Sequence, residues 1–181
     1  MRKLNDILGD CNVTVYGFPA FEALEDHCNK NGSSVIISTQ SAAVMADKGI
    51  TDYFAPVIPR GTIYGTAKDV LNANLDVNHV TVEKCPDVPT DAFVIIASQH
   101  PGTVEFLEKM YPNHRTLAHV EPADILAEDV VGTLPAHLIQ YAGSFRAVAI
   151  KDFDYAKDGD IDGKELEDRM IFTSTIKASV F

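Results

Sequence analysis

Short runs of β-branched and apolar residues alternate with helix-type patterns along this sequence, and this alternation restricts its fold more than any other feature. Residues 13–16 and 34–37 predict strands, and helix-type segments follow them at residues 20–29 and 42–48. Parallel neighbouring strands need a crossover connection, which is usually a helix. The sequence therefore predicts an α/β protein with a Rossmann-like, mainly parallel sheet.

The rest of the chain continues the alternation. In the first half we expect extended segments at residues 53–58 and 62–64, a helix at 67–74 and a strand at 79–83. In the second half we expect strands at residues 92–98, 117–120, 129–131 and 146–150, and helices at 101–110 and 135–141. Each half carries its own strands and helices, so the sequence predicts two domains, at residues 1–91 and 92–181.

The two halves share short strings in the same order, which favours an internal duplication. Residues 35–40 (VIISTQ) match residues 94–99 (VIIASQ), and the pair Gly65-Thr66 matches the pair Gly132-Thr133. A duplication would make the chain a covalent pseudo-dimer with one site between its halves. Two Rossmann-like halves can also share such strings by chance, and the alternative is one continuous sheet with a single copy of the site.

The charge of the chain argues against several classes of partner. It has 26 acidic and 15 basic residues, so its formal net charge is −11. This charge repels polyphosphate, which disfavours duplex DNA and anionic membrane surfaces. No apolar run approaches the roughly 20 residues that span a bilayer, and the N-terminus shows no secretory pattern. Cys11, Cys28 and Cys85 form no Cys-x-x-Cys pair, as is typical of reduced thiols. We therefore expect a cytoplasmic protein.

A strand-to-helix corner at residues 98–103 is the first candidate site. Here the carboxyl end of a predicted strand meets a helix N-terminus, where free N–H groups and the helix dipole favour an anion. Gly102 would let a ligand approach the backbone. The polar side chains of the corner are those of Ser98, Gln99, His100 and Thr103. The alternative is an ordinary N-terminal cap with a solvated histidine.

The two Gly-Thr corners are the second candidate, because backbone nests at such corners can hold phosphates. In the second half the candidate ligand-binding residues are Gly132, Thr133 and His137. Their expected counterparts in the first half are Thr39, Gln40, Ser41, Gly65, Thr66 and Lys68. Neither a Walker motif nor a Gly-x-Gly-x-x-Gly fingerprint is present, so we expect no cofactor.

Metal-binding patterns are weak in this sequence. The six histidines show no paired spacing, so no catalytic metal is expected. Residues 154–165 follow the EF-hand loop pattern in part, but Ala156 stands at the third ligand position and a strand is expected before the loop. An acidic surface turn is the favoured interpretation, and a calcium site is the alternative.

Four segments within residues 94–170 resemble, in order, a small CRISPR-associated family found beside type III interference genes. Motif 1 of this family, Ser-Arg-His-Pro-Gly-Ala, corresponds to residues 98–103, and motif 2, a His with an acidic-Pro step, to residues 119–125. Motif 3, Asp-x-Val-x-Gly-Thr/Asn-Leu-Pro-x-x-Leu, corresponds to residues 129–138, and motif 4, Arg-Gly-x-Glu-Leu, to residues 162–166.

The resemblance implies a Rossmann-like sensor of cyclic oligoadenylates and a metal-independent ring nuclease. Such an enzyme lines up a ribose 2′-OH for in-line attack on the adjacent phosphate and leaves 2′,3′-cyclic phosphate ends. It implies His100 and Ser98 as catalytic residues, in a monomeric pseudo-dimer or a homodimer. Gln99 and Asp162 stand where the family has arginines. The alternative is therefore a sponge that sequesters the intact messenger and so antagonises an antiviral defence system.

Overall fold

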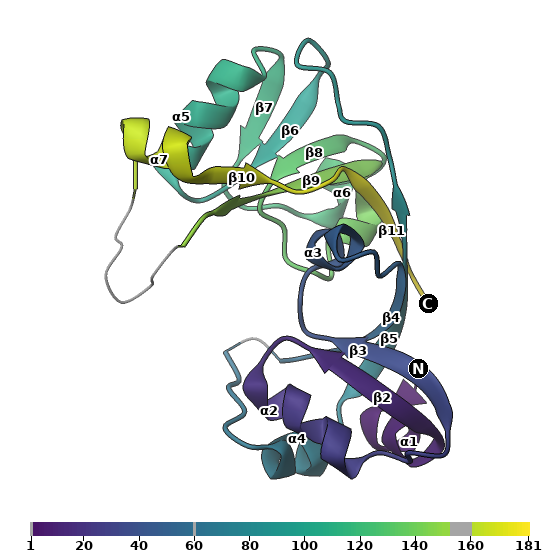
Figure 1. The fold of residues 1–181 in the computed structure, drawn as a ribbon. Coiled ribbons are helices and arrows are strands. Elements are labelled where there is room, and N and C mark those ends of the chain that lie inside the picture. Colours follow the sequence, from purple (N-terminus) through teal and green to yellow (C-terminus); the bar gives the residue numbers. More distant parts are fainter. Residues whose placement is uncertain (1, 60, 153–160) are drawn as a thin grey trace. The chain divides into compact units, whose positions relative to one another are not determined.

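The computed structural model describes residues 2–59, 61–152 and 161–181, and the chain forms two compact units (Figure 1). Unit 1 comprises the residues up to Val82 together with Ser179–Phe181, and unit 2 comprises Glu83–Ala178. The chain thus passes from unit 1 to unit 2 nine residues before the predicted boundary at 91/92, and its C-terminus belongs to unit 1. Both units combine strands with helices, which confirms the predicted α/β class.

Unit 1 contains a mixed set of strands. They are β1 (Arg2–Lys3), β2 (Cys11–Tyr16), β3 (Ser33–Ser38), β4 (Asp52–Pro56) and β5 (Asp76–Lys84). The order is β2-β3-β4-β5, in which β2, β3 and β4 are parallel, whereas β5 is antiparallel to both β4 and β1. The helices are α1 (Leu4–Asp10), α2 (Pro19–Glu22), the 3₁₀ helix η1 (Ala23–His27), α3 (Ala42–Asp47) and α4 (Ala67–Ala73).

The alternation of residues along β2 explains how the core of unit 1 is built. Cys11, Val13 and Val15 are buried, whereas Thr14 between them is exposed. Successive side chains of a strand point to opposite faces, so one face of β2 supplies three apolar groups to the interior. They belong to one core cluster with Leu4, Ile7, Phe21 and Leu24 from α1, α2 and η1.

Unit 2 is built around the short strand β6 (Val94–Ala97), all of whose residues are buried. The other strands are β7 (His114–Leu117), β8 (Asp129–Gly132), β9 (Ser144–Ile150), β10 (Met170–Phe172) and β11 (Ile176–Val180). Strands β7, β6, β8 and β9 lie in that order and are parallel, and both β10 and β11 pair antiparallel with β9.

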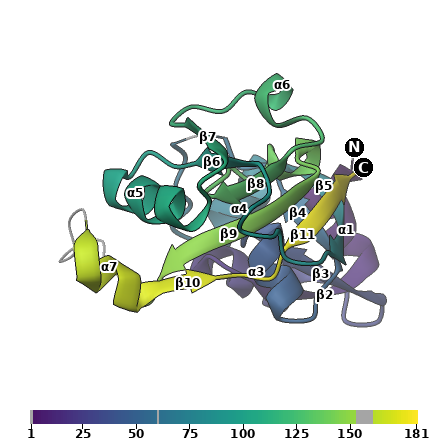
Figure 2. The ribbon, with the colours of Figure 1, turned by 90° about the horizontal axis from the view of Figure 1, so that it is seen from above.

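The helices of unit 2 are α5 (Pro101–Met110), α6 (Pro122–Ile125), the 3₁₀ helix η2 (Ile139–Tyr141) and α7 (Gly163–Arg169). Helix α5 packs against β6 and β8, and α7 packs against α5 (Figure 2). Leu107 and Tyr111 at the end of α5 are completely buried, in one cluster with Val94, Ile96 and Val131. These apolar residues therefore mark the face of the helix that covers the strands.

Three predicted elements differ from the structure. The helix expected at 135–141 is a series of turns that ends in η2, because its N–H groups bond three residues back: Leu138 N–H to Pro135 O at 2.9 Å and Tyr141 N–H to Leu138 O at 3.0 Å. The strand expected at 117–120 lies earlier, at β7. The helix expected at 20–29 is divided into α2 and η1.

The strand order does not show the predicted duplication. Strand β3, the expected counterpart of β6, lies between the earlier strand β2 and the later strand β4. Strand β6 instead lies between β7 and β8, which both follow it in the chain. The two strand ends do share one local feature, because Thr39 N–H donates to Tyr16 O at 3.0 Å and Ser98 N–H donates to Leu117 O at 3.2 Å. In the part of the chain that the structure describes, the similarity between the two halves is therefore limited to the ends of β3 and β6.

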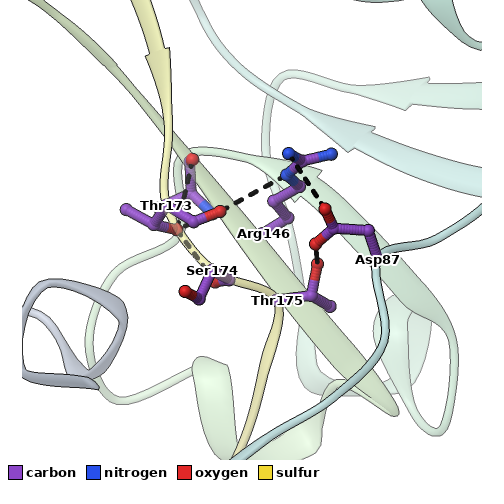
Figure 3. A network of polar contacts seen from close by, with 6 residues as sticks. Asp87, Arg146, Thr173, Ser174 and Thr175 are labelled. Atoms are coloured by element: carbon purple, nitrogen blue, oxygen red, sulfur yellow. Dashed lines mark hydrogen bonds and ion pairs between the residues drawn. The ribbon is translucent and has the colours of Figure 1, made fainter. Parts of the chain in front are cut away.

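A polar network holds the connection between β10 and β11 against β9 (Figure 3). Arg146 Nε donates to Thr173 O at 3.3 Å, and its Nη2 lies 3.3 Å from Asp87 Oδ2. The buried Thr175 donates its hydroxyl to Asp87 Oδ1 at 2.7 Å. The Arg146 guanidinium also lies over the Phe172 ring, 4.7 Å from its centroid. One arginine thus joins three segments of unit 2.

The Thr175→Val variant is expected to lower the free energy of unfolding by about 1 kcal/mol, the usual contribution of one hydrogen bond. Valine keeps the shape of the side chain but removes the donor to Asp87, whose half-exposed carboxylate can take water instead. Urea denaturation followed by circular dichroism measures the change. The exposed Thr90, replaced by valine, is the control, and a loss above about 3 kcal/mol at Thr175 would contradict this single-bond account.

Candidate functional site

The carboxyl ends of β6, β7 and β8 meet at one edge of unit 2, because these three strands are parallel. Backbone hydrogen bonds join the residues that follow them. Ser98 N–H, after β6, donates to Leu117 O of β7, and Thr133 N–H, after β8, donates to Ala97 O of β6 at 2.7 Å. In open α/β sheets this edge is where ligands bind. We refer to it as the β6 edge.

The corner between β6 and α5 exposes two polar side chains of motif 1. Ser98 is buried, and its Oγ accepts a hydrogen bond from His100 N–H at 3.2 Å, which shapes the turn. His100 is the N-cap residue of α5, and Pro101 occupies the first turn. Thr103 is buried, whereas Gln99 and His100 are exposed. Of the predicted side chains of this corner, only these two are accessible to a ligand in this structure.

Gly102 brings motif 1 into contact with motif 4. A Cβ added to Gly102 would lie 2.6 Å from Ile161 O and 3.3 Å from Asp162 Cβ. The glycine is therefore needed because the chain before α7 passes directly over the first turn of α5. The exposed Asp162 is the N-cap residue of α7. Its position beside the positive end of the α5 dipole is electrostatically favourable for a carboxylate.

Gly132 and Thr133 of motif 3 pack against and bond to the backbone of β6. Gly132 has a φ of +129°, and a Cβ on it would lie 2.1 Å from Ala97 O. Thr133 N–H is already bonded to that same oxygen, so this amide is not a free anion donor. The side chains of Thr133 and His137 are exposed. At this corner a ligand would therefore meet side chains rather than a backbone nest.

In unit 1, hydroxyl groups of the predicted site residues support local structure. Thr39 Oγ1 accepts from Phe18 N–H at 3.0 Å, and Ser41 Oγ accepts from Val44 N–H at 3.4 Å at the start of α3. Thr66 forms a capping box with Asp69 at the start of α4. The N–H of Gln40 donates to Ser38 Oγ at 3.0 Å. Gly65 and Lys68 are exposed. The polar groups of Thr39, Gln40, Ser41 and Thr66 thus cap helices or close turns within unit 1.

Within unit 2 the structure brings motif 4 into contact with motif 1 and motif 3 to the strand end beside motif 1. Motif 2 starts after β7, and its helix α6 packs against η2. The predicted cleft shared by the two halves stays a prediction. The contact of residues 161–162 with Gly102 was not foreseen, because it joins segments about 60 residues apart in the sequence. In the sequence, only the order of the motifs, shared with the family, indicated that these two segments belong to one site. Residues 154–160 of the calcium-loop candidate lie outside the described residues, and Gly163–Arg169 form α7.

The pKa values of Glu105, Lys109 and Tyr53 are shifted by their immediate surroundings. A hydrogen bond from Lys109 lowers the pKa of Glu105, and the same contact raises the pKa of Lys109, on the outer face of α5. Burial raises the pKa of Tyr53 to about 12, which keeps its hydroxyl neutral in unit 1. Across residues 2–59, 61–152 and 161–181, no three His, Cys, Asp or Glu side chains are grouped to hold a metal ion.

Comparisons with protein-family models, curated proteins and solved structures gave no match. Within the described part of the chain, no helix has both the length and the apolar character needed to cross a membrane.

Proposed function

We propose that the β6 edge of unit 2 binds a cyclic oligoadenylate-type second messenger. The observation that supports this proposal is the meeting of motifs 1, 3 and 4 at this edge. Motif 1 follows β6, motif 3 comprises β8 and the turn after it, and motif 4 lies over Gly102 of motif 1. Motif 2 starts after β7 and ends in α6, which packs against η2. Segments that are scattered over residues 98–166 of the sequence would thus serve one ligand.

The exposed polar groups of the edge suit a ligand with phosphates and bases. Gln99, His100, Thr133 and His137 offer side-chain donors and acceptors. The N–H groups in the first turn of a helix have no partner within the helix, so α5 adds anion donors. A protonated histidine is a stronger donor to phosphate than a neutral group.

For cleavage, we propose that the chain orients the ligand so that a ribose 2′-OH attacks the adjacent phosphorus in line. The new O2′–P bond forms as the P–O5′ bond breaks, which leaves a 2′,3′-cyclic phosphate and a 5′-OH. The 2′-OH loses its proton and the departing O5′ gains one, and His100 is the group proposed to move a proton. Positioning and hydrogen bonds would lower the barrier. This step needs no metal ion or cofactor.

Retention of the intact messenger is the second candidate, and the position of Asp162 favours it. Its backbone and Cβ lie against Gly102, where developing negative charge on the phosphate would need a cation. The four motifs contain no arginine, and Lys164 is their only lysine. A site of this composition binds mainly through neutral donors, which stabilises a pentacoordinate phosphate less than arginine does.

An incubation with cyclic tri-, tetra- and hexa-adenylate in the presence of EDTA tests the proposal. Calorimetry measures binding, and chromatography separates rings from linear products. Linear products with 2′,3′-cyclic phosphate ends identify a ring nuclease, and tight binding of an unchanged ring identifies a sponge. Failure to bind any of the rings would overturn both. The mass of the complex in light scattering decides between a monomer and a homodimer.

The His100→Ala variant is expected to weaken binding of the ring roughly tenfold to a hundredfold. One hydrogen bond to a charged phosphate contributes on the order of 1.5–3 kcal/mol, and about 1.4 kcal/mol is a factor of ten. Calorimetric titration with the ring that the wild type binds measures the change. His27→Ala, at an exposed histidine of unit 1, is the control. Equal affinities of the folded His100→Ala variant and the wild type would remove motif 1 from the site.

A further inference from the structure

The outer side of β2 has a regular set of backbone donors. Strand β2 is the terminal strand of its sheet, with β3 on one side. Tyr16 O accepts from Thr39 N–H on the β3 side. Because successive residues of a strand point their N–H groups to opposite sides, the N–H groups of Val13, Val15 and Gly17 point away from β3. Unpaired donors of this kind are a template on which a further strand can add.

In this structure, side chains from one short segment accept hydrogen bonds from all three of these N–H groups. Gly17 N–H donates to Glu22 Oε1 at 3.3 Å, and Val15 N–H donates to Glu25 Oε1 at 2.7 Å. Val13 N–H donates to Cys28 Sγ at 3.4 Å. The three acceptors are evenly spaced in the sequence, three residues apart. They run antiparallel to the strand, so the last acceptor meets the first donor.

The 3₁₀ conformation of η1 explains why this spacing fits. A 3₁₀ helix has three residues per turn and rises about 2.0 Å per residue, so side chains three apart lie on one line about 6 Å from each other. Alternate donors of a strand are about 6.6 Å apart. In an α-helix, residues three apart are only about 4.5 Å apart along the axis and lie at different angles around it. A 3₁₀ helix therefore stays in register with the strand edge.

We infer that the segment from Pro19 to Cys28 is a strap that closes the outer edge of β2 against strand addition by a second copy of this chain. The Glu25 contact is central, because a carboxylate is a strong acceptor and its distance to Val15 N is the shortest of the three. Cys28 is held in place as its Sγ lies 3.3 Å from Glu25 O. The strap thus depends on acceptor atoms at residues 22, 25 and 28, and not on negative charge alone.

Amide hydrogen exchange of the full chain, measured by NMR, tests the central contact. In Glu25→Ala, the Val15 amide is expected to exchange about tenfold faster or more, since a bond to a charged acceptor is lost. The amides of Thr14 and Tyr16, on the β3 side, should change little. Glu25→Gln keeps an oxygen acceptor and should preserve most of the protection. Asp26→Ala, at the neighbouring exposed carboxylate, is the control.

Light scattering over a range of concentrations tests the closure itself. The triple variant Glu22→Ala/Glu25→Ala/Cys28→Ala is expected to self-associate more than the wild type, and Glu22→Gln/Glu25→Gln is not. Equal association of the Gln variant would show that charge closes the edge and would overturn the proposal. An unchanged Val15 amide in Glu25→Ala would also overturn it, and this single variant decides the matter if the triple variant does not fold.

Discussion

The Gly132→Val variant is expected to leave unit 2 unfolded or nearly so, with a loss of more than about 4 kcal/mol in the free energy of unfolding. A Cβ at this position would lie 2.1 Å from Ala97 O and 3.0 Å from Ala97 C, which are backbone atoms of the central strand β6. They cannot move aside without breaking the pairing of β6 with β8. The φ of +129° adds backbone strain for any L side chain, most of all for a β-branched one.

Gly65→Ala is the matched control for this prediction, because Gly65 is the sequence counterpart of Gly132 in the other Gly-Thr corner. Among the described residues, the only neighbour of a Cβ at Gly65 within 4 Å is Asp69 Oδ2, at 3.7 Å. Its thermal midpoint should therefore stay within a few degrees of that of the wild type. Thermal unfolding followed by circular dichroism compares the two variants. A folded Gly132→Val protein that only loses ligand binding would instead favour a backbone nest for phosphate at this corner.

The Asp162→Arg variant is expected to bind the cyclic oligoadenylate about tenfold tighter or more. The substitution removes a carboxylate beside the first turn of α5 and adds a guanidinium that can bond phosphate in a bidentate manner. One such bond contributes on the order of 1.5–3 kcal/mol. Calorimetric titration measures the affinity, and chromatography of the same samples detects any gain in ring cleavage.

Asp168→Arg is the control for this second prediction. It makes the same change of net charge at another exposed position of α7, outside the four motifs. A general electrostatic effect would tighten binding equally in both variants and would weaken with added salt. Equal affinities of the Asp162→Arg and Asp168→Arg proteins would contradict a site beside Gly102. A gain confined to Asp162→Arg, with cleavage, would mean that the arginine-depleted edge limits catalysis in the natural chain.

Local patterns along the chain predicted most of the elements. The strand predicted at residues 92–98 became the shorter β6 (Val94–Ala97), and the helix predicted at residues 101–110 became α5 with the predicted bounds. Such patterns reflect side-chain periodicity and helix capping, which act over a few residues. The pattern at residues 135–141 misled because Pro135 starts a turn whose bonds span three residues. Sequence periodicity does not distinguish that turn from the first turn of an α-helix.

The sequence by itself determined the α/β class, the positions of β6 and α5, and the polar corner between them. Only the tertiary structure decided the strand order, the packing of Gly132 on Ala97, and the passage of residues 161–162 over Gly102. The reason is physical. Periodicity is a property of neighbouring residues, whereas strand order and close backbone approach depend on which distant segments bury each other, and the same local pattern is compatible with several such arrangements.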